Sequence, residues 1–153
     1  MDRNHDGVAR RDLLVAGALG AAAIGFAAPA VAAAAGHTAA EAANVKLVTE
    51  FCNSFGEPEK LKDFLAPDSS VRFDEKQAPM IGPAALVDAW KKAVGDGKVS
   101  AKILSTVAKG PIVMNVRVDT VTTAGKPDQI FKIVGVFLVR DGKIKEWTDY
   151  QNG

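Results

Sequence analysis

The chain has few of the residues on which many catalytic and binding sites depend. Cys52 is its only cysteine, which excludes an internal disulfide and a thiolate metal cluster and favours a buried position in a helix. The two histidines are His5, near the N-terminus, and His37, which precedes the domain that we expect at residues 41–152. The globular part therefore has no histidine for a serine-type triad or a zinc site, and we expect neither a metal nor another cofactor.

An excess of charge of one sign is also missing. The 153 residues include 19 lysines and arginines against 18 aspartates and glutamates, a formal net charge of +1, and the two signs are interspersed. A protein that binds a nucleic-acid backbone usually concentrates basic residues on one surface. The turn Gly95-Asp96-Gly97 lacks the glycine spacing and the lysine of a phosphate loop. We therefore expect small molecules or proteins as partners, and no nucleic acid.

Residues 1–36 are predicted to be an export leader outside the folded domain. The pair Arg10-Arg11 precedes a stretch rich in alanine, glycine and leucine at 13–35, with small residues suited to cleavage at 32–36. The arginine pair, with Leu13 two places beyond it, resembles the bacterial twin-arginine signal. We expect a domain that works in the periplasm or outside the cell. The alternative is an uncleaved anchor helix, which the glycines and the proline of the stretch disfavour; membrane contact is expected only through this leader.

The hydrophobic pattern after residue 40 predicts one α+β domain over residues 41–152. Apolar residues at helical spacing predict two main helices and a short helical segment, at 41–55, 83–94 and 59–65. Alternating apolar residues predict five strands, at 70–74, 101–108, 111–123, 130–140 and 143–150. The order of these elements places helices before a meander of strands.

The pairing of the last two strands can be predicted from their connection. Asp141-Gly142 favours a two-residue hairpin turn, because both positions tolerate a positive φ. Cross-strand partners step outward one for one from such a turn. This register sets Val134 opposite Asp149 and Val136 opposite Trp147.

The preceding strand then brings a second aspartate to the same face of the sheet. If Thr123 lies opposite Ile130 across the preceding loop, Asp119 lies opposite Val134, with Arg117 in the next row. The backbones of the two aspartates are then separated by two strand spacings, about 9 to 10 Å. An arginine side chain can bridge that gap. We therefore predict a polar site of two carboxylates and one guanidinium.

The face of the sheet opposite the two aspartates is predicted to be apolar. Its residues are Met114, Val116, Val118, Ile133, Phe137, Val139 and Ile144. A sheet with one wet face alternates more cleanly than this, so we expect both faces to be covered. One face would pack on the helices around a pocket, and the other would form a homodimer contact.

The strand motifs resemble the limonene-1,2-epoxide hydrolase family. The similarity rests on Arg117-Val118-Asp119 and on residues 135–150, GVFLVRDGKIKEWTDY, and it covers about residues 44–151. This family belongs to the nuclear-transport-factor-2-like superfamily, which also includes polyketide cyclases and ketosteroid isomerases. The resemblance implies a cone-shaped α+β fold, with N-terminal helices packed on a curved, mainly antiparallel mixed sheet.

The resemblance also implies roles for the three charged residues. Asp119 would protonate the oxygen of an epoxide, Arg117 would link the acids, and Asp149 would activate the attacking water. Such a reaction needs no covalent intermediate and no metal. A small lipophilic epoxide is the implied substrate, and Trp147 is expected to be a wall of its pocket, with Val134 and Val136 on the same face.

One part of the family pattern is missing. The family holds its water with a tyrosine and an asparagine on the first strand, where this chain has residues 71–74, Val-Arg-Phe-Asp. Asn115 would supply an amide from the acid face, or Arg72 and Asp74 would face inward and build a different polar site. The spacing leaves both arrangements open.

Three functions therefore compete. The first is hydrolysis of a small lipophilic epoxide by acid and base catalysis. The second is an isomerase or cyclase of the ketosteroid or polyketide type, which needs a base near a carbon acid and a donor for the oxyanion. The third is a non-catalytic exported module for ligand binding or dimerisation.

Overall fold

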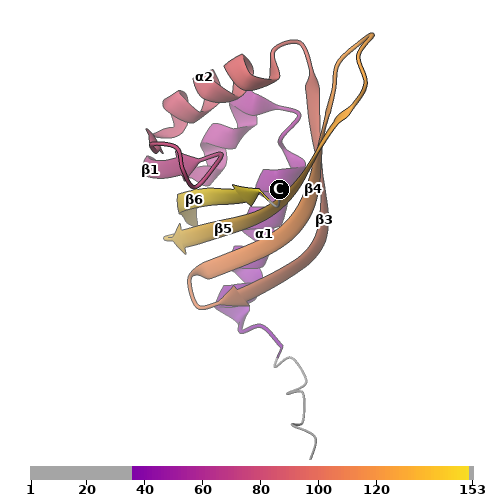
Figure 1. The fold of residues 1–153 in the computed structure, drawn as a ribbon. Helices are drawn as coiled ribbons and strands as arrows, with labels where there is room; N and C mark the ends of the chain where they lie inside the picture. Colours follow the sequence, from indigo (N-terminus) through magenta and orange to yellow (C-terminus); the bar gives the residue numbers. More distant parts are fainter. Residues whose placement is uncertain (1–35, 152–153) are drawn as a thin grey trace, which may run out of the picture. The chain divides into compact units, whose positions relative to one another are not determined.

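The computed structural model describes residues 36–151 (Figure 1). The predicted leader lies outside this range except for Gly36. The elements in chain order are α1 (Ala39–Asn53), the 3-10 helix η1 (Pro58–Phe64), β1 (Leu65–Arg72), β2 (Met80–Ile81), α2 (Pro83–Val94), β3 (Lys98–Lys109), β4 (Ile112–Thr122), β5 (Gln129–Arg140) and β6 (Lys143–Gln151). None of the helices in this range is both long enough and apolar enough to cross a bilayer.

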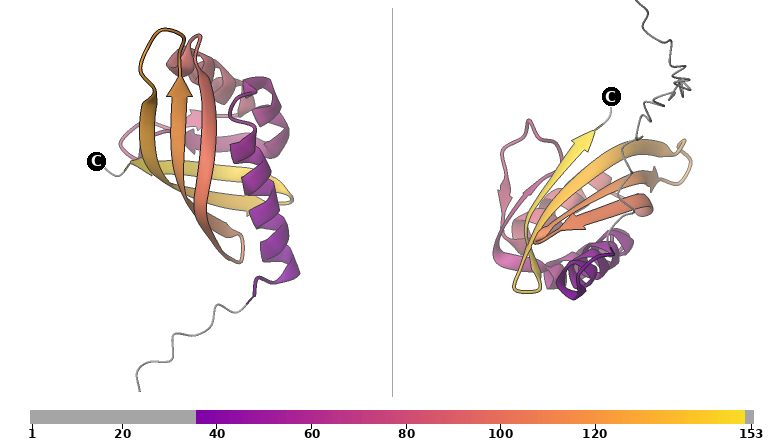
Figure 2. Two further views of the ribbon diagram at one scale, coloured as in Figure 1. Left: turned by 90° about the vertical axis from the view of Figure 1, so that its right-hand side faces the viewer. Right: turned by 90° about the horizontal axis from the view of Figure 1, so that it is seen from below.

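Six strands form one sheet in the order β2-β1-β6-β5-β4-β3. All neighbours are antiparallel except β1 and β6, which are parallel. The helices cover one face of this curved sheet (Figure 2). The predicted α+β class and the mainly antiparallel mixed sheet are confirmed. The two-residue strand β2 was not predicted, because it is too short to show an alternating pattern.

The two main helices have clear sequence signals at their starts. Thr38 caps α1: its hydroxyl accepts the Glu41 N–H at 3.2 Å, while the Glu41 carboxylate accepts the Thr38 N–H at 2.9 Å. Pro83 opens α2 directly after Gly82, as the sequence predicted, because a proline in the first turn loses no helical hydrogen bond. Cys52 is fully buried in α1, which confirms that prediction.

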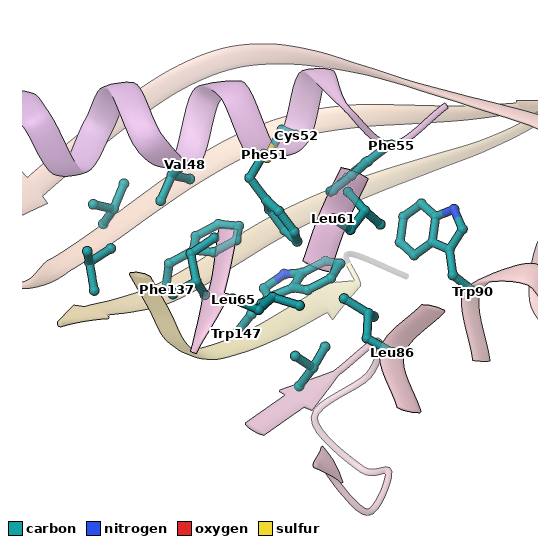
Figure 3. Packing of buried hydrophobic residues seen from close by; sticks show 14 of the residues in the cluster. Val48, Phe51, Cys52, Phe55, Leu61, Leu65, Leu86, Trp90, Phe137 and Trp147 are labelled. Carbon is teal, nitrogen blue, oxygen red and sulfur yellow. The ribbon is translucent and has the colours of Figure 1, made fainter. Parts of the chain in front are cut away.

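An aromatic cluster fills the space between the helices and the sheet. Trp147 of β6 lies at its centre, with ring centroids 5.1 Å from Phe51, 5.6 Å from Phe55 and 5.9 Å from Phe137 (Figure 3). Such edge-to-face and stacked contacts add to the free energy gained by burial of the rings. The cluster holds α1 and β6 in fixed positions beneath the polar site.

The strand pairing differs from the prediction at both junctions. Asp119 lies opposite Phe131 and not Val134, because the loop between β4 and β5 closes with Val121 opposite Gln129. The pairing of β5 with β6 shifts by one between Leu138 and Val139, since Lys145 is an extra residue in β6. As a result, Gly135 lies opposite Asp149.

These shifts change which residues of β5 face the helices. Ile133, Phe137 and Val139 of β5 are buried on the helix side, as is Ile144 of β6, although the sequence placed them on the outer face. Met114 and Val116 of β4 do lie on the outer face, where they are exposed. Relative to the prediction, the pairing of β4 with β5 is shifted by three residues and that of β5 with β6 by one. Each odd shift exchanges the two faces, so together they leave Asp119 and Asp149 on the same face, as predicted.

Candidate active site

Arg117 is the centre of the polar site. It is 1% exposed and lies on β4, with Asp119 two residues further along the same strand. Its Nε donates to both carboxylate oxygens of Asp119 at 3.0 Å, and its Nη2 donates to Oδ2 of Asp149 on β6. Its Nη1 donates to Oδ1 of Asn115 at 3.2 Å. The guanidinium therefore joins the two carboxyl groups across three strands.

Two aromatic rings of the core pack against this charged cluster. The Arg117 Cζ lies 5.3 Å from the ring centroid of Phe55 and 5.8 Å from that of Trp147, which are cation–π distances. The indole Nε1 of Trp147 donates to Oδ1 of Asp149 at 2.6 Å. Each oxygen of Asp149 therefore accepts its own N–H donor, whereas the two oxygens of Asp119 share a single one.

Burial raises the pKa of both aspartates. For Asp149 the pKa rises to about 6, because removal from water outweighs the opposing effects of Arg117 and the Trp147 hydrogen bond. Burial also raises the pKa of Asp119, against the attraction and hydrogen bonds of Arg117. Burial lowers the pKa of Arg117, but the nearby carboxylates of Asp149 and Asp119 raise it by more. The net change is upward, so the guanidinium stays charged. The cluster is electrically neutral when the two carboxyls share one proton.

Both aspartates line a cavity of about 210 Å³. Its walls are mainly apolar and include Phe73, Trp90, Val99, Val121, Phe131 and Ile133. Gln129 and Gln151 also contribute to the lining. The cavity has the size for a small organic molecule, with an acid–base pair on one wall.

The domain model described as a SnoaL-like domain matches residues 45–147. The chain belongs to the SnoaL-like domain family. No curated protein sequence matches it.

Solved structures share the fold of this SnoaL-like domain. An epoxide hydrolase described as LEH-like, from M. tuberculosis, is 23% identical, with a TM-score of 0.65 over 73% of this chain and 84% of that one. A candidate polyketide cyclase from Xanthomonas campestris is 22% identical, with a TM-score of 0.63 over 73% and 92%. The epoxide hydrolase/cyclase-like enzyme SalBIII, described with a role in pyran ring formation in the polyether salinomycin, is 17% identical, with a TM-score of 0.65 over 73% and 92%. The predicted nuclear-transport-factor-2-like fold is thus confirmed.

Two of the predicted pocket residues lie beneath the cavity of the SnoaL-like domain. Trp147 is fully buried in the aromatic cluster, and the lining found among the described residues does not include it. Asn115 is also buried, where its Oδ1 accepts from Arg117 and its Nδ2 lies 3.4 Å from Sγ of Cys52. Both side chains position the charged groups. Trp90 of α2 is 8% exposed and forms part of the cavity wall.

The prediction that Val134 and Val136 line the acid face is wrong. Asn115, Arg117 and Asp119 pair with Gly135, Ile133 and Phe131, and paired residues share a face. The two valines therefore lie on the outer face of β5.

The inward-facing alternative for Arg72 and Asp74 is also wrong. Val71 is fully buried beside Trp147, and Phe73 lines the cavity, so alternation directs Arg72 to the opposite face. Asp74 follows the end of β1, where its Oδ1 accepts the N–H of Lys76 at 2.8 Å in an exposed turn.

Besides the apolar walls of the cavity, Gln151, Gln129 and Gly135 were missed from the sequence. Gln151 follows Asp149 by two residues and could have been placed by alternation alone. Gln129 required the correct pairing of β4 with β5. Gly135 gives space to the guanidinium, and a glycine inside a strand is itself a signal of close approach. Within residues 36–151 no group of three histidine, cysteine, aspartate or glutamate side chains could hold a metal ion.

Proposed function

We propose that this SnoaL-like domain is an epoxide hydrolase that adds water to a small lipophilic epoxide in one acid–base step. The observation that carries the proposal is a buried guanidinium joining two aspartates at an apolar cavity. An epoxide opens readily when its oxygen is protonated as water attacks carbon. One protonated and one ionised carboxyl supply both functions, and Arg117 makes that combination neutral.

Hydrogen bonding supports Asp119 as the acid and Asp149 as the base. Each Asp149 oxygen accepts a donor, from Trp147 or Arg117, which favours its ionised form. Asp119 accepts one shared N–H, so a lone pair remains for a proton directed at the ligand. In the reaction, water gives a proton to Asp149 as its oxygen bonds to carbon, the carbon–oxygen bond of the ring breaks, and the ring oxygen takes the proton of Asp119. The product is a diol, and the proton then returns from Asp149 to Asp119.

Turnover of limonene oxide and styrene oxide tests the proposal. Diol formation is expected for at least one of them, and Asp149→Asn and Asp119→Asn should each lower kcat by about 10²- to 10⁴-fold, the range for loss of a general acid or base. Diol formation that does not exceed that of the Asp149→Asn control counts against hydrolysis.

The pH profile of kcat/KM is expected to be bell-shaped. The acid limb should lie near pH 6, because burial raises the pKa of Asp149 to about 6 and the base acts only when ionised. The alkaline limb should follow loss of the second proton from the coupled pair, because the acid acts only while one carboxyl keeps its proton. Asp119→Asn should remove the alkaline limb. A wild-type profile that is flat between about pH 4 and about pH 9 would contradict a shared proton.

An isomerase or cyclase is the second candidate. Val71 of β1 and Phe73, just after the end of that strand, occupy the inward positions, where the resemblance implied a tyrosine and an asparagine for holding water. Where no such residues hold a water molecule, the same base and acid suit proton transfer at a carbon beside a carbonyl group. Turnover of an unsaturated ketosteroid without diol formation favours this candidate. Ligand binding that persists in Asp119→Asn, with no turnover of any of these substrates, indicates a non-catalytic module.

We also propose that the protein is exported and forms a homodimer through its outer sheet face. Val107, Met114, Val116 and Tyr150 are exposed on the sheet face away from the helices, an apolar surface of the kind that partners cover. Export rests on the leader, which lies outside the described residues. Light scattering on the purified protein should give a dimer mass, and cell fractionation should place the protein outside the cytoplasm; a monomer or a cytoplasmic protein contradicts the respective proposal.

A further inference from the structure

Two glutamines stand out among the otherwise apolar walls of the cavity. Gln129 is the first residue of β5 and Gln151 the last of β6, so they reach the same cavity from different strands. Gln129 lies opposite Val121, and Gln151 lies opposite Ile133. Because paired residues share a face, both glutamines belong to the face that carries the aspartates.

Each glutamine is a near neighbour of one aspartate on the same face of the sheet. Gln151 follows Asp149 by two residues, a backbone distance of about 7 Å. Gln129 is two residues from Phe131, the partner of Asp119, so it lies diagonal to that aspartate at about 7 to 8 Å. The glutamines are exposed whereas the aspartates are buried. They therefore lie at the open end of the cavity, with the acid–base pair deeper inside.

A carboxamide offers one acceptor oxygen and two N–H donors. The apolar walls between the two ends hold a ligand by burial, which is not directional. Hydrogen bonds to Gln129 and Gln151 at the open end would orient the ligand, because they fix which end of it reaches the aspartates. A plain hydrocarbon epoxide makes no use of these amides.

We propose that the cavity selects an oxygenated epoxide, with a hydroxyl or carbonyl group that Gln129 and Gln151 bind at the end opposite the epoxide ring. This inference rests on the proposed function for the identity of the reacting group. It names the two glutamines as the residues that set specificity. The expected gain is that of one or two neutral hydrogen bonds, about 3- to 10-fold in affinity.

Binding of α-terpineol and limonene tests the inference without any turnover. The two molecules share one ten-carbon skeleton and one ring double bond, and neither carries an epoxide, but α-terpineol has a hydroxyl group at the end opposite that double bond. Calorimetry, or the fluorescence of Trp90 in the cavity wall, gives both dissociation constants. The ratio of the limonene Kd to the α-terpineol Kd should fall about 3- to 10-fold in the variant Gln129→Leu/Gln151→Leu. Gln77→Leu, at an exposed glutamine away from the cavity, should leave the ratio unchanged.

The same variants then separate this inference from the proposed function. For the epoxides formed at the ring double bonds of α-terpineol and limonene, the preference in kcat/KM for the α-terpineol derivative should fall in the double leucine variant by a similar factor. An unchanged binding ratio in that variant overturns the inference even if diol is formed. If the Kd ratio falls in the double leucine variant while the wild type hydrolyses neither epoxide, the result supports the polar binding site and contradicts the proposed hydrolase activity.

Discussion

Replacing Arg117 by methionine should lower the free energy of unfolding by about 3 to 5 kcal/mol at pH 8, the usual loss when one partner of a buried ion pair is removed. The side chain is 1% exposed and hydrogen-bonds to both aspartates. Methionine fills much of its volume but leaves two buried carboxyls without a positive charge. Urea denaturation followed by circular dichroism measures the loss.

The loss should be smaller at pH 5 than at pH 8. Arg117 opposes the burial that raises the pKa of Asp119 and of Asp149, so its removal raises both further. A carboxyl whose pKa is higher in the folded than in the unfolded chain, where it is about 3.9, binds its proton more tightly when folded. Its contribution to stability is therefore lost as the pH rises from the unfolded pKa through the folded one. Acid should rescue the variant by protonating both carboxyls.

Two controls separate charge from packing. Arg140→Met removes an exposed arginine at the end of β5 and should change stability by about 0.5 kcal/mol or less. Adding Asp119→Leu and Asp149→Leu to Arg117→Met should recover most of the stability, because an apolar replacement of a whole buried ion cluster is often tolerated. An Arg117→Met loss equal to that of Arg140→Met, or one that does not shrink in acid, would show that the cluster is not coupled as described.

Local chemistry made some parts of the fold predictable from the sequence. The helix 83–94 has the predicted bounds, since Pro83 and Gly95 mark its two ends. The hairpin turn also agrees with the prediction: Asp141 has φ 50° and Gly142 has φ 69°, the positive values that this residue pair tolerates. In both cases, a few neighbouring residues determine the conformation.

The long-range pairing of strands could not be predicted in the same way. The extra residue Lys145 carries no sequence signal, and it shifts the partners of every residue beyond it in β6. The loop 123–128 admits several closures, and burial of Ile133 and Phe137 against the helices decides among them. The site residues Arg117, Asp119 and Asp149 were found because their shared face depends on the sum of the two register shifts, which is even. Val134 and Val136 lie on the strand between, where only the first shift counts; it is odd, so their predicted face was wrong. Gln129 was missed because it needed the correct pairing of β4 with β5.

Gly135→Ala should abolish most of the activity at a smaller cost in stability than Arg117→Met. A Cβ at this position would overlap Nη1 of Arg117 and lie 2.8 Å from both Oδ1 of Asn115 and Cε2 of Phe137. The end of an arginine side chain normally moves aside easily. Here the guanidinium is fully buried and hydrogen-bonded to Asn115 and to both aspartates, so it cannot move without breaking those bonds.

The expected cost in stability is about 1 to 3 kcal/mol, as for other overpacked cores, while kcat should fall to nearly that of the Arg117→Met variant. Thermal unfolding and turnover of the epoxide that the wild type hydrolyses measure the two effects. Val134→Ile is the matched control, because it adds one methyl group to the neighbouring residue of β5 on the outer face, away from Arg117. Asn115→Gly in the Gly135→Ala background should restore part of the activity by giving Nη1 room to move. Wild-type turnover in Gly135→Ala would contradict the fixed position of the guanidinium, since the added methyl group and Arg117 cannot both occupy the present geometry.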